Sequence, residues 1–355
     1  MRSCTEVNDF FRHYLYRSSI QSKKSWEPIS RAMYDFFGFL EANSLSWNEF
    51  EKCLLQKGLI EEYRDYCYDV VQLKRNTVRL RIWYICEFYK FALNEGMIST
   101  LPFGYESRQV NHPGSFPGHI SGAKTVQVPD VLPKKRKDLI RYLDAYQIKQ
   151  LLEQARPNIH HYLMIKFALH TGLRREEIAT FPVSYVFDPT KAKVQTRNVR
   201  VTLDPQDGSG MKTKGSRARH IFLTTRFMQD LYHYITHHRG LLAYERSNQE
   251  KTLFLTQYGK PWSNSGKGIE RMVSKIGAKA GVTTHPHMLR HTYATHTLIA
   301  LRSTNQKAVE PLVFLKNQLG HASLRTTEVY LHIINEIADD AVLEYDNELN
   351  NPIGS

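Results

Sequence analysis

Cysteine is scarce in this chain of 355 residues, with four in total, at positions 4, 53, 67 and 86. No two of them have the CxxC spacing of a zinc ribbon or a redox pair, so they predict reduced and mostly buried thiols. No run approaches the roughly 20 apolar residues of a membrane-spanning helix. The first residues, MRSCTEVNDFFRHYL, also lack the pattern of a secretory signal. We therefore expect a soluble intracellular protein without a membrane partner.

Two common phosphoryl-transfer devices are also missing. The sequence has no acidic constellation of the kind that holds two catalytic metal ions. The segment SNSGKGIE (263–270) departs from the phosphate-loop pattern GxxxxGK[ST] at the first Gly and at the final Ser/Thr. We predict no metal and no nucleotide cofactor.

Positive charge is abundant. The chain has 48 Lys and Arg against 35 Asp and Glu, a formal net charge of +13. A fold does not require such an excess, whereas a polyanionic partner favours it through the release of counterions. Composition alone does not separate DNA from RNA or from an acidic membrane surface.

Hydrophobic spacing predicts two domains of different type. Residues 1–105 contain apolar residues at helical spacing and predict a small all-helical domain. Residues 106–137 lack periodicity, are rich in Gly, Pro, Ser and His, and predict a basic linker. Residues 138–345 predict a second domain that ends in a C-terminal helix, followed by a tail at 346–355. This second domain changes to a β pattern between 193 and 224, which predicts a small antiparallel sheet in a mainly α fold.

Basic residues gather in three places, which we predict to contact DNA phosphates. The segment PKKRK (133–137) also resembles a nuclear localisation signal, but we favour a basic tether lying on phosphates. The predicted DNA contacts are Lys74, Arg75, Arg79 and Arg81, then Lys134, Lys135 and Arg136, and finally Lys212, Arg217 and Arg219.

Three histidines near the C-terminal end allow two interpretations. His285, His287 and His291 have spacings that suit metal ligands, but no nearby Cys or carboxylate completes a tetrahedral set. The alternative pairs His287 with Arg290, three residues later on the same helical face, to handle a phosphate. We favour the second interpretation.

The remaining polar residues suit attack on a phosphodiester. Such attack concentrates negative charge on the non-bridging oxygens, which Arg174 and Arg290 can clamp while His321 adds a donor. Tyr330 is the candidate nucleophile. A phenol of pKa about 10 is only about a thousandth ionised at neutral pH, so it needs a positive field and a base.

Three further residues complete this hypothesis. His287 is the candidate base, and Lys214 is the candidate acid that protonates the leaving 5′ oxygen. Glu177 lies three residues after Arg174, and we expect it to orient the pocket rather than to react.

Five segments in this order resemble the tyrosine recombinase (phage integrase) family: TGLRREEI, KTKGSRARHIFL, HPHMLRHTYATH, LGHAS and TTEVYLH. The resemblance covers about 137–335 and implies that 138–345 is the catalytic domain. The helical region 1–105 is similar to the family's core-binding, DNA-binding domain. The resemblance implies a two-domain C-clamp on a double-stranded DNA recombination site, with a homotetramer pairing two sites and accessory DNA-bending or directionality factors. It also implies cytoplasmic, nucleoid-associated work in a bacterium or phage, and nuclear work only in a eukaryote. We expect no separate arm-site-binding domain before the helical region.

Carried over to this sequence, the resemblance implies a role for each matching residue. Tyr330 would form a 3′-phosphotyrosine, and Glu177 would fill the acidic position beside the first arginine. The residues implied to surround the scissile phosphate are Arg174, Lys214, His287, Arg290 and His321.

The chain departs from the family pattern in three places. Extra polar residues occupy 302–310, Phe222 stands where proline is frequent, and Lys212 lies close enough to Lys214 to compete for its role. After Tyr330, apolar residues at helical spacing (333–345) predict a helix that packs either on its own domain or on a neighbouring protomer.

Two other functions fit the same fold. A tyrosine-dependent topoisomerase would cut and reseal one strand without a partner site, and a regulator would bind DNA without cutting it. We favour the site-specific recombinase. The apolar stripe after Tyr330, which suits contacts between protomers, argues against the topoisomerase, and the filled polar positions argue against the regulator. Integration, excision, inversion and resolution share this chemistry.

Overall fold

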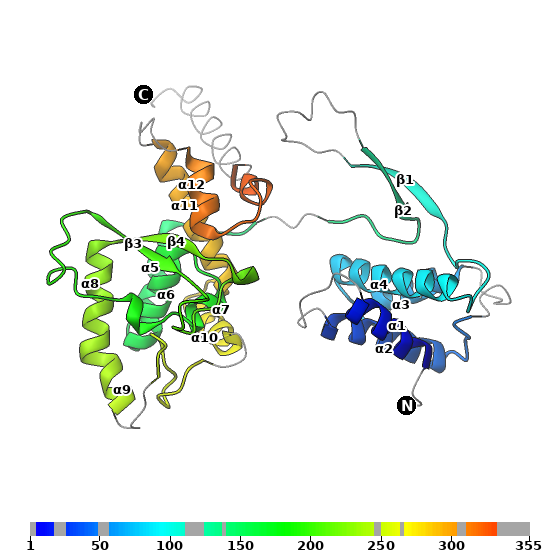
Figure 1. Cartoon of the computed structure of the whole chain (residues 1–355), viewed down its shortest axis with the longest axis horizontal. Coiled ribbons are helices and arrows are strands. Elements are labelled where there is room, and N and C mark those ends of the chain that lie inside the picture. Colours follow the sequence, from blue (N-terminus) through cyan, green and yellow to red (C-terminus); the bar gives the residue numbers. More distant parts are fainter. Residues whose placement is uncertain are drawn as a thin grey trace, which may run out of the picture. The chain divides into compact units, whose positions relative to one another are not determined.

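The computed structural model divides the chain into two compact units, Met1–Asp138 and Leu139–Ser355 (Figure 1). It describes residues 5–17, 26–48, 57–110, 124–136, 140–244, 250–262, 266–303 and 310–331. Each unit has its own hydrophobic core. Within the described residues, no helix is both long enough and apolar enough to span a bilayer.

The first unit is a helical bundle closed by aromatic side chains. Its helices are α1 (Thr5–Phe11), α2 (Trp26–Ala42), α3 (Leu59–Asp69) and α4 (Arg75–Asn94), with a π-helical turn at Arg12–Arg17. Helix α4 packs against the other three. Phe10 meets Phe88 edge to face, with ring centroids 5.6 Å apart, and Phe36 meets Tyr63 in the same way at 5.1 Å. Such contacts add to the burial of apolar area, so aromatic packing fixes how α1 and α2 lie on the bundle.

The predicted linker (106–137) contains regular structure, which corrects our expectation. Strand β1 (Tyr105–Val110) pairs antiparallel with β2 (Lys124–Pro129). Val131 and Leu132 follow β2 and are buried in the core of the first unit. The hairpin was not predicted because each strand is short and a long Gly- and Pro-rich stretch separates the two strands, so the sequence gives no local signal of their pairing.

The second unit is mainly helical with one small sheet, as predicted. Strand β3 (Asn198–Leu203) pairs antiparallel with β4 (Arg219–Thr224). Alternate residues of both strands are buried, so one face of this sheet packs on the core. The helices are α5 (Ala145–Ala155), α6 (Ile159–Thr171), α7 (Arg175–Ala179), α8 (Thr225–Tyr234), α9 (Gly240–Tyr244), α10 (Lys267–Lys279), α11 (Pro286–Ser303) and α12 (Pro311–Leu319).

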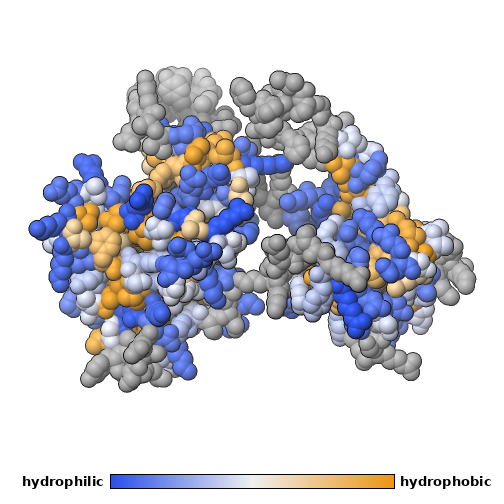
Figure 2. Space-filling view, viewed as in Figure 1, coloured by the Kyte–Doolittle hydropathy of each residue, from blue (hydrophilic) through white to orange (hydrophobic). Residues whose placement is uncertain are grey.

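Helix α11 organises the second unit. It packs against α6, α10 and α12, and α12 in turn packs against β4. Tyr330 lies beyond α12, in a further helical turn that begins at Arg325. Hydrophilic side chains cover most of the visible face of each unit, and hydrophobic patches lie among these side chains (Figure 2).

Gly172 ends α6 in the left-handed conformation, with φ of 61°. A Cβ at this position would lie 2.4 Å from Tyr293 Cδ1 and 2.8 Å from Leu319 Cδ2. The chain therefore needs glycine here for two reasons, the backbone conformation and the close approach of α11 and α12.

Replacing Gly172 by alanine should lower the free energy of unfolding of the second unit. The left-handed backbone costs about 1–2 kcal/mol for an L-residue, and the steric overlap adds to this cost. Urea unfolding followed by circular dichroism measures the loss. Gly281→Ala is the matched control, because Gly281 has φ of 68° but a Cβ placed there would have no neighbour within 4 Å. Equal losses in the two variants would contradict the packing argument.

Candidate active site

Three arginines meet at the C-terminal end of α12. The Leu319 carbonyl accepts from Arg174 Nη1 at 3.2 Å and from Arg290 Nη2 at 2.8 Å. The Gly320 carbonyl accepts from Arg174 Nη2 at 3.1 Å, and the Gln318 carbonyl accepts from Arg219 Nε at 3.4 Å. The last carbonyls of a helix lack partners within the helix and carry partial negative charge. The end of α12 therefore holds guanidiniums that would otherwise repel one another.

Arg290 is the most deeply buried of these arginines. It lies on α11, its side chain is among the largest that are fully buried, and its Nη1 donates to the Gly172 carbonyl at 2.7 Å. Burial lowers the pKa of Arg290, and the charge of Arg174 lowers it further. Two carbonyls from different helix ends thus fix the plane of the Arg290 guanidinium.

Glu177 supplies the negative charge that balances the cluster. Its carboxylate is 1% exposed and accepts from the Arg174 backbone N–H at 2.8 Å and from Arg174 Nη1 at 3.2 Å. Arg219 donates to both oxygens, at 2.9 and 2.7 Å. Burial acts to raise the pKa of Glu177, but hydrogen bonds and charge from Arg219, followed by those from Arg174, outweigh it and lower the pKa. Glu177 is therefore ionised and orients two guanidiniums at once.

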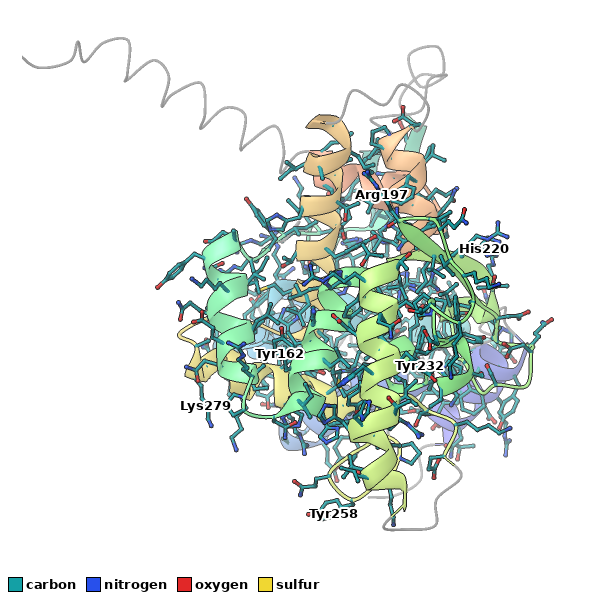
Figure 3. The ribbon with its side chains drawn as sticks, turned by 90° about the vertical axis from the view of Figure 1, so that its left-hand side faces the viewer. Tyr162, Arg197, His220, Tyr232, Tyr258 and Lys279 are labelled. Atoms are coloured by element: carbon teal, nitrogen blue, oxygen red, sulfur yellow. The ribbon has the colours of Figure 1, made fainter. Side chains whose placement is uncertain are left out.

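Arg219 has a role in the structure that the sequence analysis did not assign. We predicted it as a DNA contact, whereas its guanidinium lies on Glu177 and its side chain is only 11% exposed. The alternation of β4 carries the missing signal, since Arg219 has the same parity as the buried Ile221 and Leu223. The intervening His220 is exposed and projects outward (Figure 3).

Tyr330 lies in a small apolar cluster with its hydroxyl paired inside the protein. It is 1% exposed and packs with Ala294, Leu298, Leu315 and Leu319. Its hydroxyl is 2.9 Å from His291 Nδ1. Burial raises the pKa of Tyr330 to about 12, although the charges of Arg290 and Arg174 act in the opposite direction. The phenol is therefore protonated at neutral pH and lies within the field of both arginines.

The hydrogen-bond partner of Tyr330 differs from the predicted base. His287 is exposed at the start of α11, and its ring lies 4.3 Å from that of His291, edge to face. Neighbouring atoms nevertheless remove part of the water around its imidazole, and this desolvation together with the charge of Arg290 lowers the pKa of His287, so it is neutral at neutral pH. His291 contacts both the His287 ring and the Tyr330 hydroxyl, and the role of His287 as base stays a prediction.

His321 lies beside the ring of Tyr330. Its Nδ1 is hydrogen-bonded to Thr327 Oγ1 at 2.9 Å, and its ring is parallel to that of Tyr330, with centroids 6.4 Å apart. Burial lowers the pKa of His321 to about 3, and the charges of Arg290 and Arg174 contribute. His321 is thus a neutral imidazole whose orientation Thr327 sets.

The predicted leaving-group acid lies on the surface. Lys214 is exposed in a 3₁₀ turn (Lys214–Ser216) before β4, where Gly215 and Ser216 both have positive φ. Lys212 is also exposed, and its backbone N–H donates to Thr180 Oγ1 at 3.1 Å. The structure does not place either ammonium in contact with the arginine cluster, so the choice between them stays a prediction.

Two of the three histidines considered as metal ligands, His285 and His291, form hydrogen bonds within the protein. His285 Nδ1 accepts from the Met288 backbone N–H at 3.3 Å at the start of α11, and His291 pairs with Tyr330. In the part of the chain that the structure describes, no three His, Cys, Asp or Glu side chains are placed to hold a metal ion.

Predicted DNA contacts from two distant segments lie together in the first unit. Asn76 donates to the Arg136 carbonyl at 3.0 Å and accepts from its N–H at 3.2 Å, while Arg79 donates to the Pro133 carbonyl. These bonds hold 133–136 along the start of α4. The exposed basic residues there are Lys74, Arg75, Lys134, Lys135 and Arg136.

Arg81 differs from these residues. It forms an ion pair with Asp35, and its side chain is 16% exposed. Its charge thus already has a partner inside the first unit. Arg217 is exposed just before β4, as a DNA contact requires.

Most of the extra segment 302–310 and the whole predicted tail helix (333–345) lie outside the described residues.

Comparison with known proteins gives a consistent result. The Phage integrase family matches residues 141–336. The tyrosine recombinase XerC of Bacillus subtilis is 25% identical over 342 residues, which cover 93% of this chain and 94% of XerC. The tyrosine recombinase XerA of Saccharolobus solfataricus is 29% identical over 220 residues, 62% of this chain and 60% of XerA.

Solved structures share the fold. The XerH site-specific recombinase in a post-cleavage complex with its palindromic difH substrate gives a TM-score of 0.60 at 15% identity, covering 98% of this chain and 90% of XerH. The Tn1549 transposon integrase in complex with transposon right end DNA gives a TM-score of 0.60 at 18% identity, covering 93% and 94%.

Glu177→Gln should destabilise the second unit by about 3–5 kcal/mol at neutral pH, because it leaves buried arginines without their counter-charge. The lowered pKa of Glu177 means that its ionised form adds stability above its usual pKa of about 4.5, and that this contribution is lost as pH falls. The difference in free energy of unfolding between wild type and variant, called here the stability gap, should therefore become smaller below about pH 4.5.

Urea unfolding at a series of pH values measures this gap. Glu270→Gln is the control, since Glu270 pairs with Arg175 at the surface and is 50% exposed. A surface pair of this kind contributes at most about 1 kcal/mol. A gap for Glu177→Gln that stays constant down to pH 3 would contradict the ion-pair account.

Proposed function

The chain belongs to the phage integrase family of tyrosine recombinases, and on this premise we propose that it is a site-specific recombinase that cleaves and rejoins duplex DNA through a 3′-phosphotyrosine at Tyr330. One observation carries the proposal: a buried tyrosine hydroxyl lies in the field of two arginines that share the Leu319 carbonyl at one helix end. The similarity to XerC and XerA, both tyrosine recombinases, supports the same reaction class.

The two arginines would bind the scissile phosphate. A guanidinium has five N–H donors, and the two carbonyl bonds of Arg290 engage only part of them. The remaining donors of Arg174 and Arg290 suit the non-bridging oxygens, on which negative charge grows as the nucleophile attacks. His321, held by Thr327, would add a further donor.

Cleavage would conserve the number of phosphoester bonds. Tyr330 Oη attacks phosphorus, the P–O5′ bond breaks, and the DNA 3′ end becomes joined to the phenol oxygen. The phenol proton passes to a base, for which His287 is the candidate, and the O5′ leaving group takes a proton from Lys214. The 5′ hydroxyl of a second DNA strand then reverses these steps. No nucleotide is consumed, because one ester replaces another.

The partner would be a double-stranded DNA recombination site. Phosphate contacts would come from the exposed basic residues beside α4 in the first unit and from Lys212 and Arg217 in the second. XerH and the Tn1549 integrase were solved with DNA, in line with this assignment. Strand exchange between two sites requires several protomers, and we propose a homotetramer working with accessory DNA-binding factors. Integration, excision, inversion and resolution all remain compatible with this chemistry.

Tyr330→Phe should bind DNA with unchanged affinity and form no covalent adduct. It removes the nucleophilic oxygen while the ring stays in its apolar cluster. The substrate is a duplex that the protein selects from a random-sequence pool, nicked near the selected site so that the cut strand cannot be resealed. Detergent-stable adducts are counted on denaturing gels.

The outcomes of this experiment separate the candidate functions. Adducts at one inverted-repeat site that disappear in Tyr330→Phe support the recombinase. Wild-type adducts scattered over all sequences would instead indicate a topoisomerase. Adducts that persist in Tyr330→Phe would exclude Tyr330 as the nucleophile, and an absence of wild-type adducts would indicate a DNA-binding protein without cleavage activity.

Lys214→Ala should slow cleavage by a factor of about 10²–10⁴, the range typical of general acid catalysis. Replacing the bridging 5′ oxygen by sulfur should restore the rate, because a thiolate leaves without a proton. Lys212→Ala is the matched control, since Lys212 is also exposed and lies two residues before Lys214. Restoration of Lys212→Ala rather than Lys214→Ala would reassign the acid.

A further inference from the structure

We infer that His291 is a positioning residue for strand cleavage, which holds the Tyr330 hydroxyl in the field of Arg290 and Arg174. This inference rests on the proposed role of Tyr330 as nucleophile. The hydrogen bond between His291 Nδ1 and Tyr330 Oη, 2.9 Å long, carries it. A phenol ring in an apolar cluster can turn or tilt, and this bond fixes where its oxygen lies.

His291 and Arg290 are consecutive residues on α11. Arg290 is anchored by the Gly172 and Leu319 carbonyls, so the helical turn that carries both residues is fixed by bonds to α6 and α12. Tyr330 arrives from a different segment, beyond α12. The His291 bond therefore links the nucleophile to the same rigid turn that presents a phosphate-binding arginine.

Neighbouring rings restrict the His291 imidazole itself. The His287 ring contacts it at 4.3 Å, edge to face, and the Tyr330 ring lies 5.7 Å away at a tilt of 55°. A hydrogen-bond partner whose own ring is packed against a neighbour, here His287, restricts the phenol oxygen more than a free side chain would. Misplacing a reacting atom by about 1 Å can cost on the order of a hundredfold in rate.

Electrostatics favour positioning over proton abstraction. Burial lowers the pKa of His291 to about 3, and repulsion between protonated forms of His291 and His287, followed by the charge of Arg290, contributes. A proton taken from Tyr330 would place a further cation beside two arginines. A neutral imidazole can hold the hydroxyl in either tautomer, whereas the proton itself must go elsewhere during attack.

The test compares two nearly isosteric replacements of His291. Asparagine offers an amide near the position of Nδ1, with both donor and acceptor capacity, whereas leucine offers neither. The measured quantity is the first-order rate constant of adduct formation at saturating enzyme, on the nicked duplex selected by the protein. His291→Leu should lower it at least about tenfold with unchanged DNA affinity. His291→Asn should recover most of the rate.

A second histidine on the same helix provides the structural control. His296, also on α11, bonds through Nε2 to the Leu143 carbonyl at 2.8 Å and is likewise half-buried. His296→Leu should reduce thermal stability without changing the rate per folded molecule. A His291→Leu rate equal to or above that of wild type would overturn the inference, as would a His291→Asn rate as low as that of His291→Leu.

A Tyr330→Phe arm separates this inference from the function on which it rests. Adducts that persist in Tyr330→Phe, or that do not form with wild type, would defeat the proposed function itself. Loss of adducts in Tyr330→Phe together with normal rates in His291→Leu would defeat only the role of His291.

Discussion

The end of helix α12 is the contact on which the rest of the site depends. Its last carbonyls accept hydrogen bonds from three guanidiniums, two of which share the single oxygen of Leu319. Like charges this close repel, and the repulsion is strongest where water is excluded. The partial negative charge of the helix end and the buried carboxylate of Glu177 offset it. Contacts within the protein therefore hold the cluster together, and the binding of a phosphate would not have to gather the charges.

The same contact ties stability to chemistry. Arg290 links α11 to the Gly172 turn after α6 and to the end of α12, and Arg219 links β4 to Glu177. Residues scattered over half of the sequence thus converge through side chain to main chain bonds rather than through apolar packing alone. Under the proposed function, positive charge fixed in this way would stabilise the charge that develops on the phosphate without reorganisation at the moment of reaction.

Much of this arrangement could be predicted from the sequence. The mainly α class with a small antiparallel sheet is confirmed, and Arg174, Glu177 and Arg290 lie in contact around one helix end. The hydrogen bond between His291 and Tyr330 was not predicted. Helical spacing shows that His287 and His291 lie on the same face of a helix, but it does not show which of the two contacts a tyrosine distant in sequence. Arg219 was assigned by its charge, while the strand alternation that turns it inward was overlooked. The β1–β2 hairpin depends on pairing between strands separated by a long Gly- and Pro-rich stretch, for which local sequence gives little signal.

The central claim is that this cluster activates Tyr330 to form a covalent link to DNA. Mass spectrometry of the nuclease-digested adduct measures it most directly, because the residual nucleotide marks the attachment residue. The account predicts the added mass on Tyr330, joined through a 3′ phosphate. Attachment at any other residue, or through a 5′ phosphate, would contradict it.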